Sequence, residues 1–331
     1  MAEATIRDVA RRAQVSVASV SRVLNRLDNV SEATRARVTA AVDELGYVPH
    51  AGARSLSLAR TGAIGVVLPN LHGEFFSEIV RGMDRLATER GYLLLLSNMH
   101  AQSSTADVVL KAMRGRVDGL IVMAPHLEDE EFATALPRGT PAVLLNTREK
   151  VSGRSAIRLD NAEGARAVAE HLVAIGRRQI VHISGPAGNI DAEERAEAFR
   201  SALEQHPDVR FEIVQGNFYE ESGSEAVSAL VGAGHRFDAI FAGNDMMAIG
   251  ALTGLRKAGL AIPEDVAVAG FDDVPLASHL GLTTVRVRIA ELGERAIERL
   301  IAMLQGEAEG GSEELHAPEL VVRESTVAAA R

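Results

Sequence analysis

The chain has 331 residues, of which 47% are hydrophobic and 24% are charged, so it is long enough for two or three globular domains. It contains no cysteine, which excludes disulfides and thiolate zinc sites. No apolar run is long enough to span a membrane and no signal peptide precedes the first helix, so we expect a cytoplasmic protein without a membrane partner.

The net charge of −10 is unevenly distributed along the chain. Residues 1–60 contain nine Arg and no Lys against six Asp and Glu, a net charge of +3, whereas the remainder carries −13. A basic head on an acidic body is typical of a chain that binds nucleic acid through its head, although a short segment can also be basic by chance.

The first 60 residues predict three helices and no strand. Thr5 and Asp8 have the spacing of a capping box, and apolar residues follow at helical spacing. After a two-residue turn, Ser16 can cap a second helix. Ser31 can cap a third helix, which Gly46 is expected to end. A short helix, a tight turn and a second helix form the helix-turn-helix pattern.

From residue 63 onward, short apolar runs alternate with amphipathic helices. Continuous apolar strands separated by helices indicate buried parallel sheets, here in two doubly wound α/β lobes that divide near residue 160. Residues 307–314 are expected to form a loop and residues 319–323 a last strand. The predicted strands are Ile64–Leu68, Leu93–Leu96, Gly119–Met123, Ala142–Leu145, Gln179–Ile183, Asp238–Ala242 and Val266–Phe271.

Several motifs occur in order along nearly the whole chain, namely Val15–Asn25, Leu45–Pro49, Val117–Ile121, Gly243–Asp245 and Gly270–Asp273. Together they resemble the motifs of the lactose/galactose-repressor (LacI/GalR) family. The resemblance implies an all-α helix-turn-helix head over residues 1–48, a hinge helix or linker over 49–60, and an effector-binding and dimerisation domain over 61–331. Its two periplasmic-binding-protein-like lobes are expected at about 61–160 and 161–320, with crossing strands near the C-terminus.

The resemblance also implies a function. We expect a sequence-specific transcriptional regulator, a repressor of a carbohydrate-utilisation operon, that binds a pseudo-palindromic operator as a homodimer. A small sugar-like effector between the lobes would control operator affinity, and a nucleoside or purine effector is the alternative. No cofactor, metal or catalytic residue is implied.

The second helix is expected to lie in the major groove with its N-terminal residues at the base edges. By resemblance, Val17 and Ala18 read the variable bases, and both can contact thymine methyls but cannot hydrogen-bond. Arg22 can bind guanine O6 and N7 together. The alternative is that this face belongs to an ordinary core helix. The predicted DNA-contacting residues are Thr5, Ser16, Val17, Ala18, Ser19, Ser21, Arg22, Asn25, Asn29, Val30, Ser31, His50, Ala53 and Leu56.

Residues 50–57 resemble the family's hinge, which folds on specific DNA and inserts a Leu into the minor groove. That Leu corresponds to Leu56, which could instead be a packing residue at the domain junction. The chain departs from the family at His50, where Asn is usual, and Gly52 inside the segment costs about 1 kcal/mol relative to Ala in a helix.

The predicted effector site combines polar side chains at strand ends with aromatic rings. Asp, Asn and Arg side chains can pair with vicinal hydroxyls, and a ring can cover the C–H face of a sugar. Each of several residues also has a purely structural alternative. Asn244 and Asp272 could cap helices, Arg195 could be a surface charge, and either Phe75 or Phe76 could belong to the core. The predicted effector-binding residues are Phe75, Phe76, Asn146, Arg195, Phe218, Asn244 and Asp272.

Two other classes of protein, an enzyme and a solute-binding receptor, are the alternatives to a regulator. An enzyme is disfavoured because the sequence lacks the common nucleotide-binding, serine-hydrolase and zinc-peptidase motifs, and its ten His are scattered. A solute-binding receptor fits the two-lobed body, but the basic head and the absence of a signal peptide argue against it.

Overall fold

The computed structural model describes residues 4–25, 30–48, 60–99, 103–126, 136–137, 139–147 and 154–327. Two compact units result, one comprising Met1–Gly62 with Gly115–Asp118, the other Ala63–Arg114 with Gly119–Arg331. Within the described residues, no helix is both long and apolar enough to cross a membrane.

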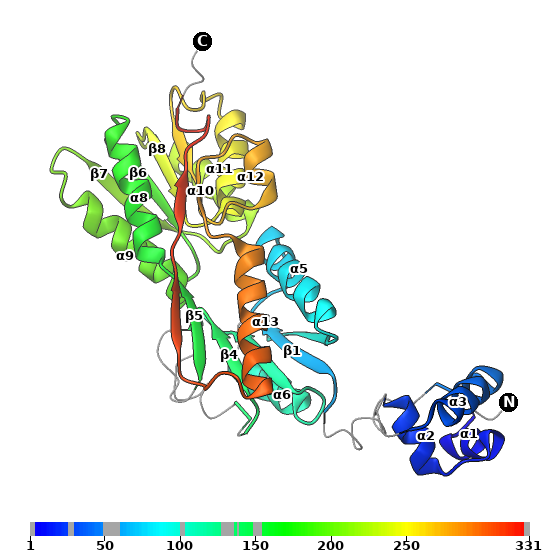
Figure 1. Ribbon diagram of the computed structural model, residues 1–331. Helices are drawn as coiled ribbons and strands as arrows, with labels where there is room; N and C mark the ends of the chain where they lie inside the picture. Colours follow the sequence, from blue (N-terminus) through cyan, green and yellow to red (C-terminus); the bar gives the residue numbers. More distant parts are fainter. Residues whose placement is uncertain are drawn as a thin grey trace. The chain divides into compact units, whose positions relative to one another are not determined.

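The N-terminal unit contains the three expected helices, α1 (Ile6–Ala13), α2 (Val17–Leu24) and α3 (Glu32–Leu45) (Figure 1). The Asp8 carboxylate accepts hydrogen bonds from the Thr5 backbone N–H at 3.0 Å and from its hydroxyl at 2.6 Å, which confirms the capping box. Ser16 Oγ accepts from the Ser19 N–H at 3.1 Å and thereby begins α2.

A small apolar core holds these helices together. Only one side of each helix contributes, which leaves the other side to solvent. The buried residues of this core are Val9, Ala10, Ala13, Val20, Val23, Val38 and Ala41.

The second unit begins with a six-stranded parallel sheet in the order β11-β5-β4-β3-β1-β2. Its central strands β1, β3 and β4 are buried along their whole length, which explains why they are apolar without alternation. The strands are β1 (Ala63–Leu68), β2 (Leu93–Asn98), β3 (Gly119–Met123), β4 (Ala142–Leu145), β5 (Ser155–Leu159) and β11 (Glu313–His316).

Helices α5 (Glu74–Glu89) and α13 (Ile289–Gln305) lie side by side in this first lobe, which also contains α6 (Ser103–Met113) (Figure 1). The two helices approach closely at glycines. A Cβ atom on Gly82 would lie 2.0 Å from the Ala290 carbonyl oxygen, and one on Gly293 would lie 2.3 Å from that of Ile79. No other residue fits at either position without moving the backbone.

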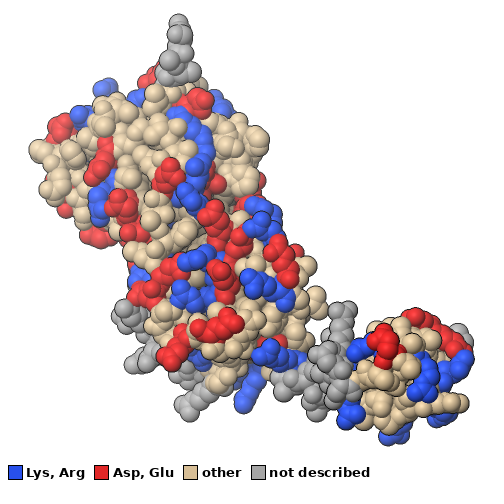
Figure 2. Space-filling model, in the orientation of Figure 1, with Lys and Arg blue, Asp and Glu red and all other residues tan. Residues whose placement is uncertain are grey.

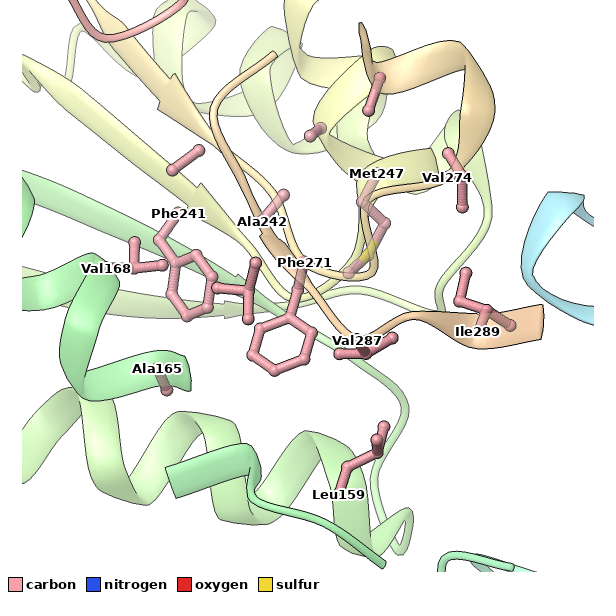
Figure 3. Close-up of a cluster of buried hydrophobic side chains, with 14 of the residues drawn as sticks. Leu159, Ala165, Val168, Phe241, Ala242, Met247, Phe271, Val274, Val287 and Ile289 are labelled. Carbon is pink, nitrogen blue, oxygen red and sulfur yellow. The ribbon is translucent and has the colours of Figure 1, made fainter. Parts of the chain in front are cut away.

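The second lobe contains a four-stranded parallel sheet in the order β7-β6-β8-β9 and an antiparallel pair of β10 with β12. Its core includes Phe241 and Phe271, which Figure 3 shows among aliphatic side chains from several elements. The elements are α8 (Asn161–Ala174), β6 (Gln179–Ser184), α9 (Ile190–Leu203), β7 (Arg210–Gln215), α10 (Glu220–Gly232), β8 (Ala239–Ala242), α11 (Asp245–Lys257), β9 (Ala267–Ala269), α12 (Pro275–His279), β10 (Thr284–Arg286) and β12 (Glu319–Val321).

The chain passes between the lobes three times, after β5, after β10 and after β11. In Figure 1 the red C-terminal segment runs alongside β5 as strand β11. It then continues into the other lobe, where β12 pairs with β10. Residues 289–316 therefore lie in the first lobe, although the sequence division near residue 160 placed them in the second.

All eight predicted strands are present, and the last of them, expected over residues 319–323, is β12. The expectation of a loop over residues 307–314 is wrong at its end, because β11 begins at Glu313. This strand lies at the edge of the sheet and is held by backbone pairing to β5 rather than by apolar burial. Leu315 is 59% exposed, so the segment has no apolar run from which a strand could be predicted.

Candidate functional site

The face of α2 that was predicted to read bases is turned to solvent. Val17 is 42% exposed, and Ala18 and Arg22 are also exposed, whereas Val20 and Val23 on the opposite face are buried. This side of α2 is therefore accessible to another molecule. The alternative that these residues belong to a core helix is wrong.

Two of the predicted DNA-contacting Ser residues also serve as helix caps. Ser16 caps α2, and Ser31 Oγ accepts from the Thr34 N–H at 3.4 Å at the start of α3. Both Ser residues are exposed, so the N-termini of two helices carry accessible donors, which is an arrangement suited to anions. Ser19, Ser21, Asn25 and Val30 are half-buried beside them, whereas Asn29, His50, Ala53 and Leu56 lie outside the described residues.

A cavity of about 450 Å³ lies between the two lobes of the second unit. Its wall is formed by the loops that follow strands of both parallel sheets, which is where ligands bind in such folds. All of the effector-binding residues predicted from the sequence line this one cavity, namely Phe75, Phe76, Asn146, Arg195, Phe218, Asn244 and Asp272.

Arg195 is the charged centre of the cavity. Its side chain is only 4% exposed and lies over the Phe271 ring, with the guanidinium carbon 3.7 Å from the ring centroid. Nε donates to Asn161 Oδ1 at 2.9 Å and Nη1 donates to the Gly243 carbonyl at 2.6 Å. The surface-charge alternative is therefore wrong, and the guanidinium is fixed in place before any ligand arrives.

Asp272 lies beside Arg195 in the cavity wall, with 3.8 Å between Oδ1 and Nη1. Burial raises the pKa of Asp272 to about 7, partly offset by Arg195 and reinforced by the neighbouring carboxylate of Asp191. Its backbone has a φ of +119°, a conformation that side-chain-bearing residues rarely adopt. A buried carboxylate in a strained backbone is a frequent feature of binding sites.

Asn146 and Phe218 are also held at positive φ, +47° and +69° respectively. The Phe218 ring lies over Gly185, where an added Cβ atom would come within 2.2 Å of the ring. Gly185 thus provides the space that places this ring at the cavity wall. Phe75 and Phe76 are both half-buried and meet edge to face with 5.4 Å between centroids, so both are available to the cavity.

Asn244 combines the two roles that the sequence left open. Its Oδ1 accepts from the Met247 N–H at 2.9 Å and caps α11, while its Nδ2 donates to the Phe218 carbonyl at 3.0 Å. The capping alternative is thus present together with a position in the cavity wall. The structure describes no cluster of His, Asp and Glu, within the residues it covers, that could hold a metal ion.

Comparison with known proteins places this geometry in a family. A model of bacterial regulatory proteins of the lacI family matches residues 5–50, and a model of a periplasmic binding protein-like domain matches residues 169–326. The ribose operon repressor of Escherichia coli K12 is 37% identical over 307 residues, which cover 90% of this chain and 92% of the relative. The chain belongs to the lacI family of bacterial regulatory proteins.

Other lacI-family relatives are about as similar. The transcriptional repressor PurR of Salmonella arizonae is 36% identical over 337 residues, covering 97% of this chain and 96% of the relative. The structure of a lac repressor dimer bound to operator and the anti-inducer ONPF has a TM-score of 0.88 at 29% identity, covering 99% and 100% of the two chains. A complex of the regulator CelR with cellobiose has a TM-score of 0.71 at 30% identity, covering 97% and 99%.

This lacI-family member is therefore a DNA-binding transcriptional regulator with an effector-binding domain, and it is not an enzyme. The expected fold class, a helical head followed by a two-lobed α/β body, is confirmed. The roles of individual DNA-contacting and effector-contacting residues stay predictions.

The regulator's cavity also contains polar residues that the sequence reasoning missed. Asp191 is 6% exposed and accepts from Asn161 at 2.8 Å and from Asn146 at 3.3 Å. Tyr219 accepts at its hydroxyl oxygen from Asn70 Nδ2 at 2.5 Å and so connects the two lobes beside the cavity. The signal for Tyr219 was its position next to the predicted Phe218, whereas Asp191 looks like an ordinary acidic residue in the first turn of a helix.

Proposed function

We propose that this regulator is a repressor that binds a two-fold symmetric operator as a homodimer and that a small sugar-like effector in the cavity sets its operator affinity. The observation that carries the proposal is the buried Arg195–Asp272 pair facing aromatic rings in a cavity between two lobes. Closure of two lobes around a ligand changes their relative position, and a ligand shifts that equilibrium by its differential affinity for the two states.

The chemistry of the cavity supports a polyol. Arg195 and Asp272 offer a donor and an acceptor for neighbouring hydroxyl groups, and Phe218 offers an apolar surface for the opposite face of a ring. The similarity to a ribose operon repressor and to a regulator solved with cellobiose points in the same direction.

A purine or nucleoside is the second candidate. The similarity to the repressor PurR favours it, and Phe75 and Phe76 form an aromatic pair beside which a base could stack. The two candidates make different demands, because a base needs a ring on its face and a sugar needs hydroxyl partners.

The test is a thermal-shift panel on the full chain with D-ribose, other pentoses and hexoses, cellobiose, hypoxanthine, guanine and nucleosides. A compound that binds only the folded state at 100 times its Kd stabilises by about 2.7 kcal/mol, so it raises Tm by several degrees. Stabilisation by a sugar alone supports the proposal, stabilisation by a purine alone replaces it with the second candidate, and no stabilisation by any compound contradicts both.

The same panel is run on Asp272→Ala and on Asp208→Ala, which removes an exposed carboxylate paired with Arg178 outside the cavity. Asp272→Ala is expected to abolish the shift and Asp208→Ala to preserve it. DNA binding is measured separately on an operator obtained by in vitro selection with the full chain. Binding that does not fall steeply with rising salt would contradict the operator-binding part of the proposal.

A further inference from the structure

Asn161 occupies an unusual position between the cavity and the connection of the lobes. It is the first residue of α8, directly after the chain leaves β5, and it is 2% exposed. Its Oδ1 accepts from Arg195 Nε at 2.9 Å, and its Nδ2 donates to Asp191 at 2.8 Å and to Glu194 at 2.9 Å. One buried amide thus joins two charged residues of the cavity to a carboxylate outside it.

Glu194 continues this chain of contacts into the other lobe. Its carboxylate pairs with Arg158 of β5, and Arg158 Nη1 lies 3.7 Å from the Glu313 carboxylate of β11. The side chains of these three residues are 26–30% exposed, so water screens their charges only in part. β5 and β11 are the two strands after which the chain crosses to the second lobe.

These contacts form a continuous path from the cavity to two of the three crossings. The Asn161 amide makes bonds with three partners, so Arg195 or Asp191 cannot reorient toward a ligand without straining or breaking one of them. Loss of one hydrogen bond at a buried amide costs free energy, because the group stays unpaired away from water. This cost favours a joint movement of Asn161 and Glu194 over the breaking of a single hydrogen bond.

We propose that Asn161, Glu194, Arg158 and Glu313 form a polar relay that couples occupancy of the cavity to the geometry of the crossings. The four residues are positioning residues, because they act through Arg195 and Asp191 rather than by touching the effector. The coupling to an effector rests on the proposed function, whereas the contacts among these four residues are present in the ligand-free protein.

The first experiment uses the ligand-free full chain and requires no known effector. The NMR resonance of the Arg195 Nε–H group reports its hydrogen bond to Asn161 directly. Arg158→Gln, three contacts away from Arg195, is expected to shift this resonance. Arg166→Gln is the matched control, because it breaks an exposed ion pair with Glu163 on α8 that is not part of the relay.

An Arg195 resonance that stays at its parental position in Arg158→Gln overturns the relay, as does an equal shift in Arg166→Gln. Glu194→Gln and the double variant with Arg158→Gln complete a double-mutant cycle. In a relay the second substitution adds little to the first, whereas independent effects would sum.

The second experiment measures coupling with D-ribose as the probe. The ratio of operator Kd with and without D-ribose is expected to fall about 2- to 30-fold in Arg158→Gln and to stay at the parental value in Arg166→Gln. A role limited to stability would lower Tm without changing this ratio, and that result contradicts the relay. If D-ribose leaves operator affinity of the parent unchanged, D-ribose is not the effector, while the NMR comparison still decides the relay.

Discussion

Arg22 on α2 and Arg195 in the cavity are the same residue type in two regions that treat it in opposite ways. Arg22 is exposed at the edge of a small helical core, and Arg195 is 4% exposed and hydrogen-bonded to Asn161 and to the Gly243 carbonyl. A guanidinium that must find bases and phosphates is best kept in water until DNA replaces that water. One that must recognise a small molecule is best fixed in advance, at the expense of stability elsewhere.

Most charged side chains of the second unit lie at its surface. Over the visible face of the second unit, acidic and basic side chains are interspersed (Figure 2), and many form ion pairs on the same helix, such as Arg81 with Glu78. Such exposed pairs contribute at most about 1 kcal/mol each. Among the charged groups, those with the strongest effect on stability are therefore the few buried ones around the cavity.

The largest expected effect comes from Arg195→Leu. It leaves Asp272 and Asp191 without their counter-charge and Asn161 without a donor, and loss of one partner of a buried pair costs about 3–5 kcal/mol. Chemical denaturation should show this loss, whereas Arg22→Leu should change stability by less than about 0.5 kcal/mol. Equal losses in the two variants would remove the contrast between the regions.

The buried residue His182 makes the stability of the second unit depend on pH. It is fully buried, donates from Nδ1–H to the Phe241 carbonyl oxygen at 2.9 Å, and stacks on the Phe241 ring. Burial lowers the pKa of His182 to about 4. The unfolded chain therefore takes up the proton first, so stability from this residue is complete above about pH 6.5 and is lost as the pH falls toward 4.

His182→Phe tests this sign. Relative to the variant, the parent should lose about 3 kcal/mol of unfolding free energy between pH 7 and pH 4. Denaturation midpoints of both proteins at several pH values provide the measurement. Parallel pH profiles would show that this histidine does not titrate differently in the two states.

On the exposed side, Arg22→Ala should reduce selectivity for the selected operator over a random duplex by about 5- to 150-fold, because one bidentate base contact is lost. Fluorescence anisotropy on both duplexes measures the ratio. Arg11→Ala on α1, where the side chain is 80% exposed, serves as the control and should leave the ratio unchanged. An unchanged ratio in Arg22→Ala would remove this residue from direct readout.

The smallest effect is expected at Ser16. Ser16→Ala removes the cap of α2 and should destabilise the N-terminal unit by about 1 kcal/mol. Ser16→Asp keeps a capping oxygen but places a negative charge toward the phosphates, so it should retain stability while weakening all DNA binding. Thermal unfolding and anisotropy separate the two roles, and strong operator binding by Ser16→Asp would argue against a phosphate contact here.

The head was largely predictable because its rules are local. Ser16 and Gly46 mark helix ends within a few residues of sequence, and the structure has both ends at those positions. In the body, the buried central strands other than β5 were predicted from their apolar runs. The edge strands β7 and β11 were not, because half of their surface is polar and only pairing with a distant strand orders them.

Some residues in and around the cavity could likewise be predicted from the sequence and others could not. Asn146, Asn244 and Asp272 follow apolar strands, and because strands of a parallel sheet end at one edge, their meeting could be predicted. Asp191 and Asn161 stand at helix starts, where Asp and Asn are common for reasons unrelated to ligands. Their importance comes from contacts between residues about thirty positions apart, which no local pattern encodes.

The three passages of the chain between the lobes limit how this protein can be recombined. Neither half of the body is a continuous stretch of sequence, so a single cut anywhere between residues 63 and 319 separates segments that must fold together. The head, by contrast, is one uninterrupted stretch with its own apolar centre. Exchange of parts with related proteins should therefore succeed at the boundary between head and body, which would give new combinations of target sequence and effector, and fail within the body.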